Sequence, residues 1–166
     1  MDPLTPTDPA AADNPWKSEG VTIMRPNLMR AITGGVLGTA VMTAMMYFVA
    51  PMMGLHMDIA QMLGSMLGNN WMAGMAMHVM MGAVLFPLTY VYALYAWLPG
   101  VPAVKGAAWG VILWLLAQAV VMPMMGAGFF SMAMGGMMAA VGSLMGHLLY
   151  GGILGAVAGA PETIRA

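Results

Sequence analysis

Charged residues are scarce in this chain, and cysteine does not occur. Of the 166 residues only 7% are charged, whereas a soluble domain carries about 25% charged residues. So few charges cannot cover a surface that faces water. The lack of cysteine excludes disulfides, thiolate metal sites and cysteine nucleophiles. The net charge of −1 argues against nucleic acid as a partner.

Long apolar segments take the place of the missing charges. Between Ala31 and Pro161 only Asp58 and Lys105 are formally charged, and a helix that crosses a bilayer needs about 20 apolar residues. We therefore predict an all-α fold, an integral membrane four-helix bundle over residues 23–160. The expected spans are residues 31–53, 72–98, 106–123 and 139–160, and residues 55–70 are expected to form an interfacial outer loop or helix.

Two polar tails flank the predicted bundle. Residues 1–22 contain four prolines and lack the pattern of a signal peptide, so we expect a flexible tail there and a second, short tail at residues 161–166. All basic residues fall on one side of the four spans: Lys17, Arg25, Arg30, Lys105 and Arg165. The positive-inside rule then places both termini in the cytoplasm, with the protein multi-pass in a bacterial or archaeal inner or plasma membrane.

A repeated pattern divides the bundle into two helix pairs. Gly34, Gly38 and the Pro-Met-Met-Gly turn at residues 51–54 recur 72 positions later as Gly106, Gly110 and residues 123–126. The repeat predicts two parallel copies of one helix pair, because two spans separate the copies. A histidine follows on the second span of each copy, with a glycine four residues later: His78 with Gly82, and His147 with Gly151.

Small residues at four-residue spacing let membrane helices approach closely. On this basis we expect helix contacts at Gly34, Gly38, Gly82, Gly106, Gly110, Gly151, Gly155 and Gly159. His78 and His147 lie on the same small-residue faces, and we place both near the outer ends of their spans. Gln118, inside the third span, is expected to bond to a neighbouring helix.

Histidine and methionine gather at the span ends away from the basic residues. The candidate metal ligands are His56, His78, His147, Met52, Met53, Met124 and Met125. Imidazole and thioether ligands together suit copper, and His78 with His147 could hold one haem b. The alternative is that each histidine only donates a hydrogen bond across a helix contact and that the 24 methionines are flexible filler. Binding of no cofactor is the favoured interpretation.

Catalytic groups are sparse on the outward side. Asp58 is the one acid there, too few for paired-carboxylate catalysis, and no glycine-rich phosphate loop with a lysine is present. We expect Asp58 to cap the start of a short surface helix. The sequence therefore predicts no enzymatic activity of its own, although the chain could be a subunit of an enzyme complex.

Three motifs carry a resemblance to a family. They are the Pro-Met-Met-Gly turn at residues 51–54, the Asp58-Ile59-Ala60 stretch, and His78 and His147 with their glycines. Over about residues 30–160 the chain resembles an uncharacterised family of small four-span, Gly- and Met-rich prokaryotic membrane proteins. The resemblance implies an association with respiratory-chain components.

We therefore expect a non-catalytic accessory subunit of a membrane electron-transfer complex, such as a respiratory haem–copper oxidase. Its partners would be the lipid bilayer and other membrane subunits, and not nucleic acid. One alternative is an outward-facing copper-binding or copper-handling membrane protein that uses methionine and histidine. A second alternative is a small b-type haem protein with two histidine ligands.

Overall fold

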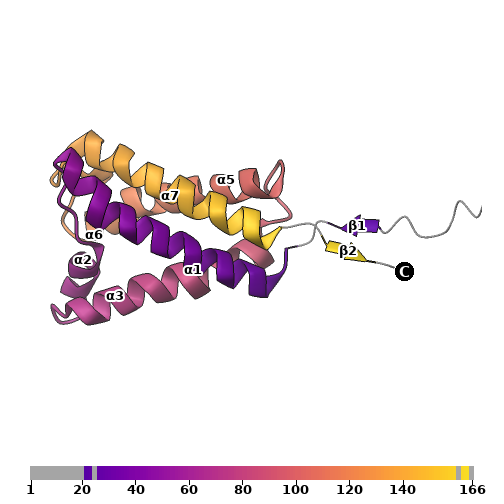
Figure 1. Ribbon diagram of the computed structural model, residues 1–166. Coiled ribbons are helices and arrows are strands. Elements are labelled where there is room, and N and C mark those ends of the chain that lie inside the picture. Colours follow the sequence, from indigo (N-terminus) through magenta and orange to yellow (C-terminus); the bar gives the residue numbers. More distant parts are fainter. Residues whose placement is uncertain (1–20, 24–25, 160–161, 165–166) are drawn as a thin grey trace, which may run out of the picture. The chain divides into compact units, whose positions relative to one another are not determined.

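Four helical spans form a bundle in the computed structural model, which describes residues 21–23, 26–159 and 162–164 (Figure 1). Each span is long and apolar enough to cross a bilayer. They run over Leu28–Met53, Trp71–Leu94, Pro102–Met124 and Gly136–Ala158, and successive spans run in opposite directions. The predicted fold class, an all-α membrane bundle, is confirmed.

Only the fourth span is one uninterrupted α-helix, α7 (Gly136–Ala158). In the first span, α1 (Leu28–Ala44) leads into a π-helical turn (Met45–Val49) and a 3₁₀ turn (Ala50–Met53). The second span consists of α3 (Trp71–Met80), a π turn (Met81–Leu85), α4 (Phe86–Thr89) and another π turn (Tyr90–Leu94). In the third, α5 (Pro102–Leu116) continues through a π turn (Ala117–Val121) into α6 (Met122–Met124).

Three of the π turns stand just before a proline: Pro51, Pro87 and Pro123. Proline lacks the amide hydrogen of the helix ladder, and its ring clashes with the carbonyl four residues earlier. A π turn is wider than an α-turn and relieves this clash. The first span therefore passes through Pro51 and ends at Gly54, whose φ of 75° is left-handed and suits glycine.

The span boundaries differ from the predicted ones by a few residues. The second span ends at Leu94 instead of residue 98. α5 begins at Pro102, four residues early, because proline is well suited to the first position of a helix. α7 begins at Gly136, directly after Gly135 with its φ of 98°. As a result His147 lies midway along α7, and the expectation that it lies near the outer end of the span was wrong.

The segment between the first two spans contains α2 (Ile59–Ser65), which lies against the start of α3 (Figure 1). Asp58 is its N-cap, and its side chain accepts a hydrogen bond from the backbone amide of Gln61 at 2.9 Å. The predicted capping role is therefore confirmed. α2 can approach α3 closely because Gly74 lies under the Ala60 carbonyl and leaves no room for a side chain. We call this end of the bundle the α2 end.

A short antiparallel pair of strands was not predicted. β1 (Val21–Ile23) pairs with β2 (Glu162–Ile164), with Val21 opposite Ile164. The two strands belong to a compact unit separate from the bundle of residues 26–160. The remainder of the predicted tails, residues 1–20, 161 and 165–166, lies outside the described residues.

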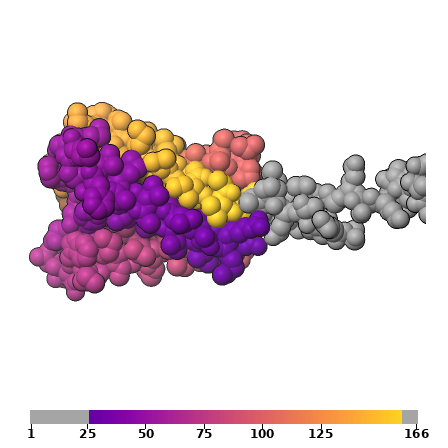
Figure 2. Space-filling model, viewed as in Figure 1, coloured from indigo at the N-terminus to yellow at the C-terminus, as the bar shows by residue number. Residues whose placement is uncertain are grey.

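Glycine contacts place α7 against both α1 and α5. Gly34 and Gly38 of α1 face Leu154 and Tyr150 of α7, and Gly106 and Gly110 of α5 face the α7 backbone at residues 147–155. α1 also contacts the second span, where Gly35 faces Gly82 and Pro87. On the face seen in Figure 2, α1 therefore lies between α3 and α7. The glycines of both repeats meet the same helix, so the contacts of the two helix pairs are not equivalent.

The packed core lies away from the α2 end. Its buried side chains are Ala31, Tyr90, Tyr95, Trp109, Leu113, Tyr150, Leu154 and Ala158. The Tyr150 hydroxyl donates to the Gly82 carbonyl at 2.7 Å, and Phe86 makes edge-on ring contacts with Trp109 and Tyr150. These contacts join the second, third and fourth spans.

Candidate functional site

A cavity of about 810 Å³ lies between the core and the α2 end. All four spans and the α2 segment contribute to its wall. Fourteen of the chain's 24 methionines line it, together with His78 and His147. These methionines are Met42, Met45, Met46, Met53, Met57, Met62, Met66, Met77, Met81, Met122, Met124, Met137, Met138 and Met145.

The structure brings together four of the seven predicted metal ligands. His78, His147, Met53 and Met124 line the cavity, whereas His56, Met52 and Met125 do not. Met52 is 86% exposed and His56 is exposed. Adjacent residues of a helical turn point about 100° apart, and here the turn directs Met53 to the cavity and leaves Met52 outside it.

His147 is held by its own helix. Its Nδ1 atom lies 2.8 Å from the Ser143 carbonyl oxygen and 3.4 Å from the Ser143 hydroxyl. Because a carbonyl oxygen can only accept, Nδ1 carries the proton and donates it, and the lone pair is on Nε2. Metal-binding histidines are commonly fixed by such a bond from the nitrogen that does not bind the metal.

His78 is held by a different helix. Its Nε2 atom lies 3.1 Å from the Thr43 hydroxyl of α1, and the hydroxyl can act as donor or acceptor. Both imidazoles line the same cavity. The remaining polar side chains of the cavity wall are Thr39, Ser143 and Tyr150.

Gln118 is fully buried but does not bond to a neighbouring helix as predicted. Its Oε1 atom accepts a hydrogen bond from the Ser131 hydroxyl at 2.8 Å. Ser131 belongs to the short 3₁₀ turn Phe129–Ser131 between the last two spans and has a left-handed φ of 56°. The bond therefore fixes the loop next to the third span.

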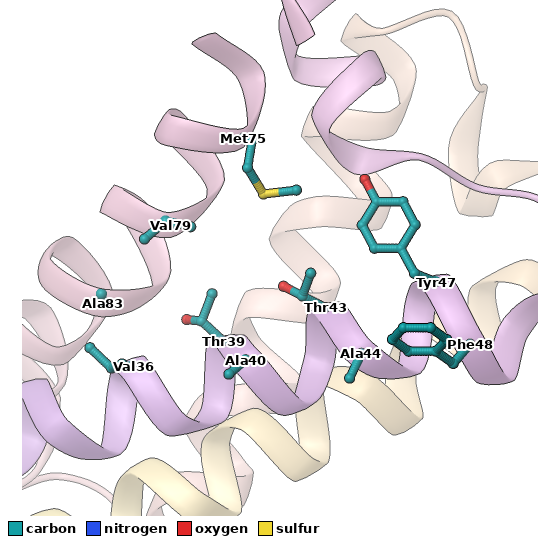
Figure 3. Close-up of a pocket in the computed structure, with 10 residues that line it drawn as sticks. All are labelled: Val36, Thr39, Ala40, Thr43, Ala44, Tyr47, Phe48, Met75, Val79 and Ala83. Atoms are coloured by element: carbon teal, nitrogen blue, oxygen red, sulfur yellow. The ribbon is translucent and has the colours of Figure 1, made fainter. Parts of the chain in front are cut away.

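An apolar groove of about 510 Å³ separates α1 from α3 (Figure 3). Thr39 and Thr43 project into it from α1, Tyr47 from the π turn that follows, and Met75 and Val79 from α3. Thr39 lines both the groove and the cavity. Thr43, which lines the groove, holds His78, which lines the cavity, so this hydrogen bond lies in the wall between the two spaces.

Asp58 ties the α2 end together. Its carboxylate accepts hydrogen bonds from the Tyr47 hydroxyl at 2.8 Å, the Gln61 amide at 2.9 Å and the Trp71 indole at 3.0 Å. Burial alone would raise the pKa of Asp58, but these hydrogen bonds outweigh it and hold the pKa below its ordinary value. The charged carboxylate thus links the end of the first span to the start of the second.

Thioethers are the abundant metal ligands in this cavity. Among the described residues no three His, Asp or Glu side chains gather in a way that could hold a metal ion. A metal bound here would need methionine sulfur to complete its coordination. Sulfur and imidazole select soft ions such as copper(I), whereas calcium and magnesium require oxygen ligands.

A comparison with protein families finds one match, which extends over residues 25–166 and is described as a family of unknown function (DUF6789). The chain belongs to DUF6789. The predicted membership of an uncharacterised family of small membrane proteins is thereby confirmed. Neither the curated proteins nor the solved structures contain a significant match to this DUF6789 chain.

Proposed function

We propose that this protein binds copper(I) inside the membrane, in the cavity between its four spans. The observation that supports the proposal is the lining: both histidines of the spans and fourteen methionines surround one space. Thioether and imidazole form the ligand set that copper(I) prefers. A membrane-embedded cavity of this kind would receive, hold and pass on the ion, which is a handling role and not catalysis.

The packed core argues against methionine as simple filler. Methionine fills irregular gaps in apolar interiors, so filler would be expected in the core itself. The buried core cluster of the described bundle instead consists of Ala, Tyr, Trp and Leu side chains, and Met42 only packs against its edge. Methionine is thus concentrated in the wall of the open space.

Haem b fits the same cavity less well. A haem carries two carboxylates, and Asp58, whose sequence neighbours Met57 and Ile59 line the cavity, would repel them. Within residues 26–159 the basic side chains are Arg30 and Lys105, near the starts of α1 and α5 and therefore at the opposite end of the bundle. Copper(I) brings no such carboxylates.

Copper content tests the proposal directly. The full chain is purified without oxygen after growth with copper, and its copper is measured by elemental analysis together with a visible spectrum. We expect about one copper per chain, loss of copper from the His78→Ala/His147→Ala double variant, and no loss from Met52→Leu, which changes an exposed methionine outside the cavity. Equal copper in all three proteins, or a Soret band from haem, would contradict the proposal.

We further propose, from the family resemblance, that copper is handled beside a membrane electron-transfer complex such as a haem–copper oxidase. The protein would be its accessory subunit in a bacterial or archaeal plasma membrane. The positions of Arg30 and Lys105, opposite the α2 end, support cytoplasmic termini. Gentle solubilisation should then co-purify other membrane subunits; recovery of this chain alone would contradict the accessory role while leaving copper binding untouched.

A further inference from the structure

The two cavity histidines differ in which nitrogen is free. His147 donates from Nδ1 to the Ser143 carbonyl at 2.8 Å, so its Nε2 lone pair has no partner among the described residues. His78 has its Nε2 occupied by the Thr43 hydroxyl at 3.1 Å. The His147 imidazole is therefore ready to bind a metal ion through Nε2, whereas His78 can bind through Nε2 only after giving up its hydrogen bond to Thr43.

The Thr43 hydroxyl contacts His78 from the groove side of the cavity wall. Its side chain projects into the groove between α1 and α3 (Figure 3) and is not part of the cavity wall. His78 itself lines the cavity. The imidazole thus lies in the wall, with Nε2 directed to the groove side.

Two thioethers of the cavity wall come from residues next to the histidines in the fold. Met42 of α1 lies over Gly146 of α7, where a β-carbon would be only 3.3 Å from the Met42 Cγ atom, and His147 is the next residue. Met81 follows His78 by about one turn and lies on the same face. Both methionines line the cavity, so the first, second and fourth spans each present candidate ligands to it.

We propose that His147 Nε2 is the first copper(I) ligand, that Met42 and Met81 supply the thioethers, and that His78 binds through Nε2, only after releasing Thr43. This inference rests on the proposed function and specifies its site. In this arrangement Thr43 weakens copper binding, because part of the binding free energy is used to break its hydrogen bond with His78. Removing the Thr43 hydroxyl should therefore make the protein a tighter copper binder.

Copper(I) alone, titrated without oxygen into the full chain in detergent against a chromophoric chelator, tests this order. We expect His147→Ala to weaken binding about 100-fold or more, and His78→Ala about tenfold. Thr43→Val, which keeps the shape of threonine, should tighten binding about fivefold, the worth of one ordinary hydrogen bond. Thr43→Ala should act in the same direction, so the prediction does not depend on the folding of one variant.

Thr33→Val is the matched control. Thr33 lies on the same helix as Thr43, and its hydroxyl bonds to the Met29 carbonyl at 3.0 Å outside the cavity wall. Its substitution should leave copper affinity unchanged. X-ray absorption of the copper-loaded protein should show nitrogen and sulfur neighbours, with one nitrogen fewer in His147→Ala.

The outcomes separate the two proposals. If the wild-type chain binds no copper(I), the proposed function is wrong. If it binds copper but His147→Ala and His78→Ala weaken binding equally, or Thr43→Val and Thr43→Ala leave affinity unchanged or weaker, only the proposed order and ligand set are overturned.

Discussion

At the residue scale, Asp58 holds the α2 end together through three hydrogen bonds to its carboxylate. One carboxylate caps α2 and accepts side-chain hydrogen bonds from both adjoining spans, through Tyr47 and Trp71. Hydrogen bonds to a charged group stabilise more than those between neutral groups. Since Met57 and Met62 flank Asp58 and line the cavity, the same carboxylate fixes the part of the cavity wall nearest α2.

Replacing Asp58 by Asn should therefore destabilise the bundle by about 1–2 kcal/mol at neutral pH, after allowance for solvent exposure. Asn still caps a helix well, so the loss reports the bonds to Tyr47 and Trp71. Because the folded pKa is lowered, the Asp58 contribution is complete above the unfolded value of 3.8 and disappears as the pH falls through the folded pKa. Unfolding free energies of the two proteins should differ from pH 5 to 8 and converge below about pH 4.

A constant difference between the two proteins down to the lowest pH, or no difference at pH 7, would contradict this role. Asp58→Ala serves as the matched comparison, because it also removes the cap and should cost more than Asp58→Asn.

The sequence predicted some of the cavity residues and missed others, and the reason can be given residue by residue. All four methionines of the repeated turn were candidates, but only Met53 and Met124 line the cavity, and the repeat alone does not distinguish them from Met52 and Met125. The methionines missed along the first span had a signal: Met42, Met45 and Met46 recur at helical spacing with the predicted Met53. The sequence could not predict that the cavity is also lined by Met57, Met62 and Met66, because their position depends on how α2 lies against α3.

At the element scale, the contact between α5 and α7 is made of backbone against backbone. Gly106 and Gly110 of α5 meet Gly151 and Gly155 of α7, and a β-carbon at any of them would collide with the partner's backbone. Gly152 lies on another face of α7, where a β-carbon would meet nothing within 4 Å. Two adjacent residues of α7 thus differ: α5 leaves no room for a side chain at Gly151, whereas Gly152 has room for one.

Gly151→Ala and Gly152→Ala should consequently change stability in opposite directions. The first adds a methyl group that cannot fit and should cost about 3 kcal/mol, in the upper range for overpacking. The second should be neutral or stabilise the helix by up to about 1 kcal/mol, because alanine is the better helix former. Unfolding in detergent, followed by circular dichroism, measures both; equal effects would mean that α5 and α7 do not pack through these residues.

The four-residue spacing of glycines predicted which face of each helix carries small residues, but not which neighbouring helix that face contacts. Gly34 and Gly106 are equivalent in the repeat, yet both face α7, because a stripe of glycines accepts any partner of suitable shape. The side chain of Tyr150 over Gly38 and the tight fit of Gly106 to Gly151 decide the arrangement. Gln118 was misassigned for a related reason: its partner Ser131 lies in a loop whose left-handed conformation leaves no periodic signal.

At the scale of the whole molecule, the lack of cysteine makes the proposed orientation easy to test. Ser65→Cys at the α2 end and Val101→Cys between the second and third spans each give the chain a single thiol at an exposed position. With cytoplasmic termini, a membrane-impermeant thiol reagent added to intact cells should label Ser65→Cys and not Val101→Cys. Labelling of Val101→Cys alone would reverse the orientation, and both should react after the cells are opened.

The position of α7 also has a consequence for biosynthesis. α1 and α5 each place their glycines against α7, and α7 is the last of the four spans to leave the ribosome. Until it enters the bilayer, the glycine faces of both helices meet lipid, and His147 is absent from the space that it later lines. The cavity is therefore completed only when this last span inserts, so the ligand set that we propose for copper(I) is assembled in the final step of biosynthesis.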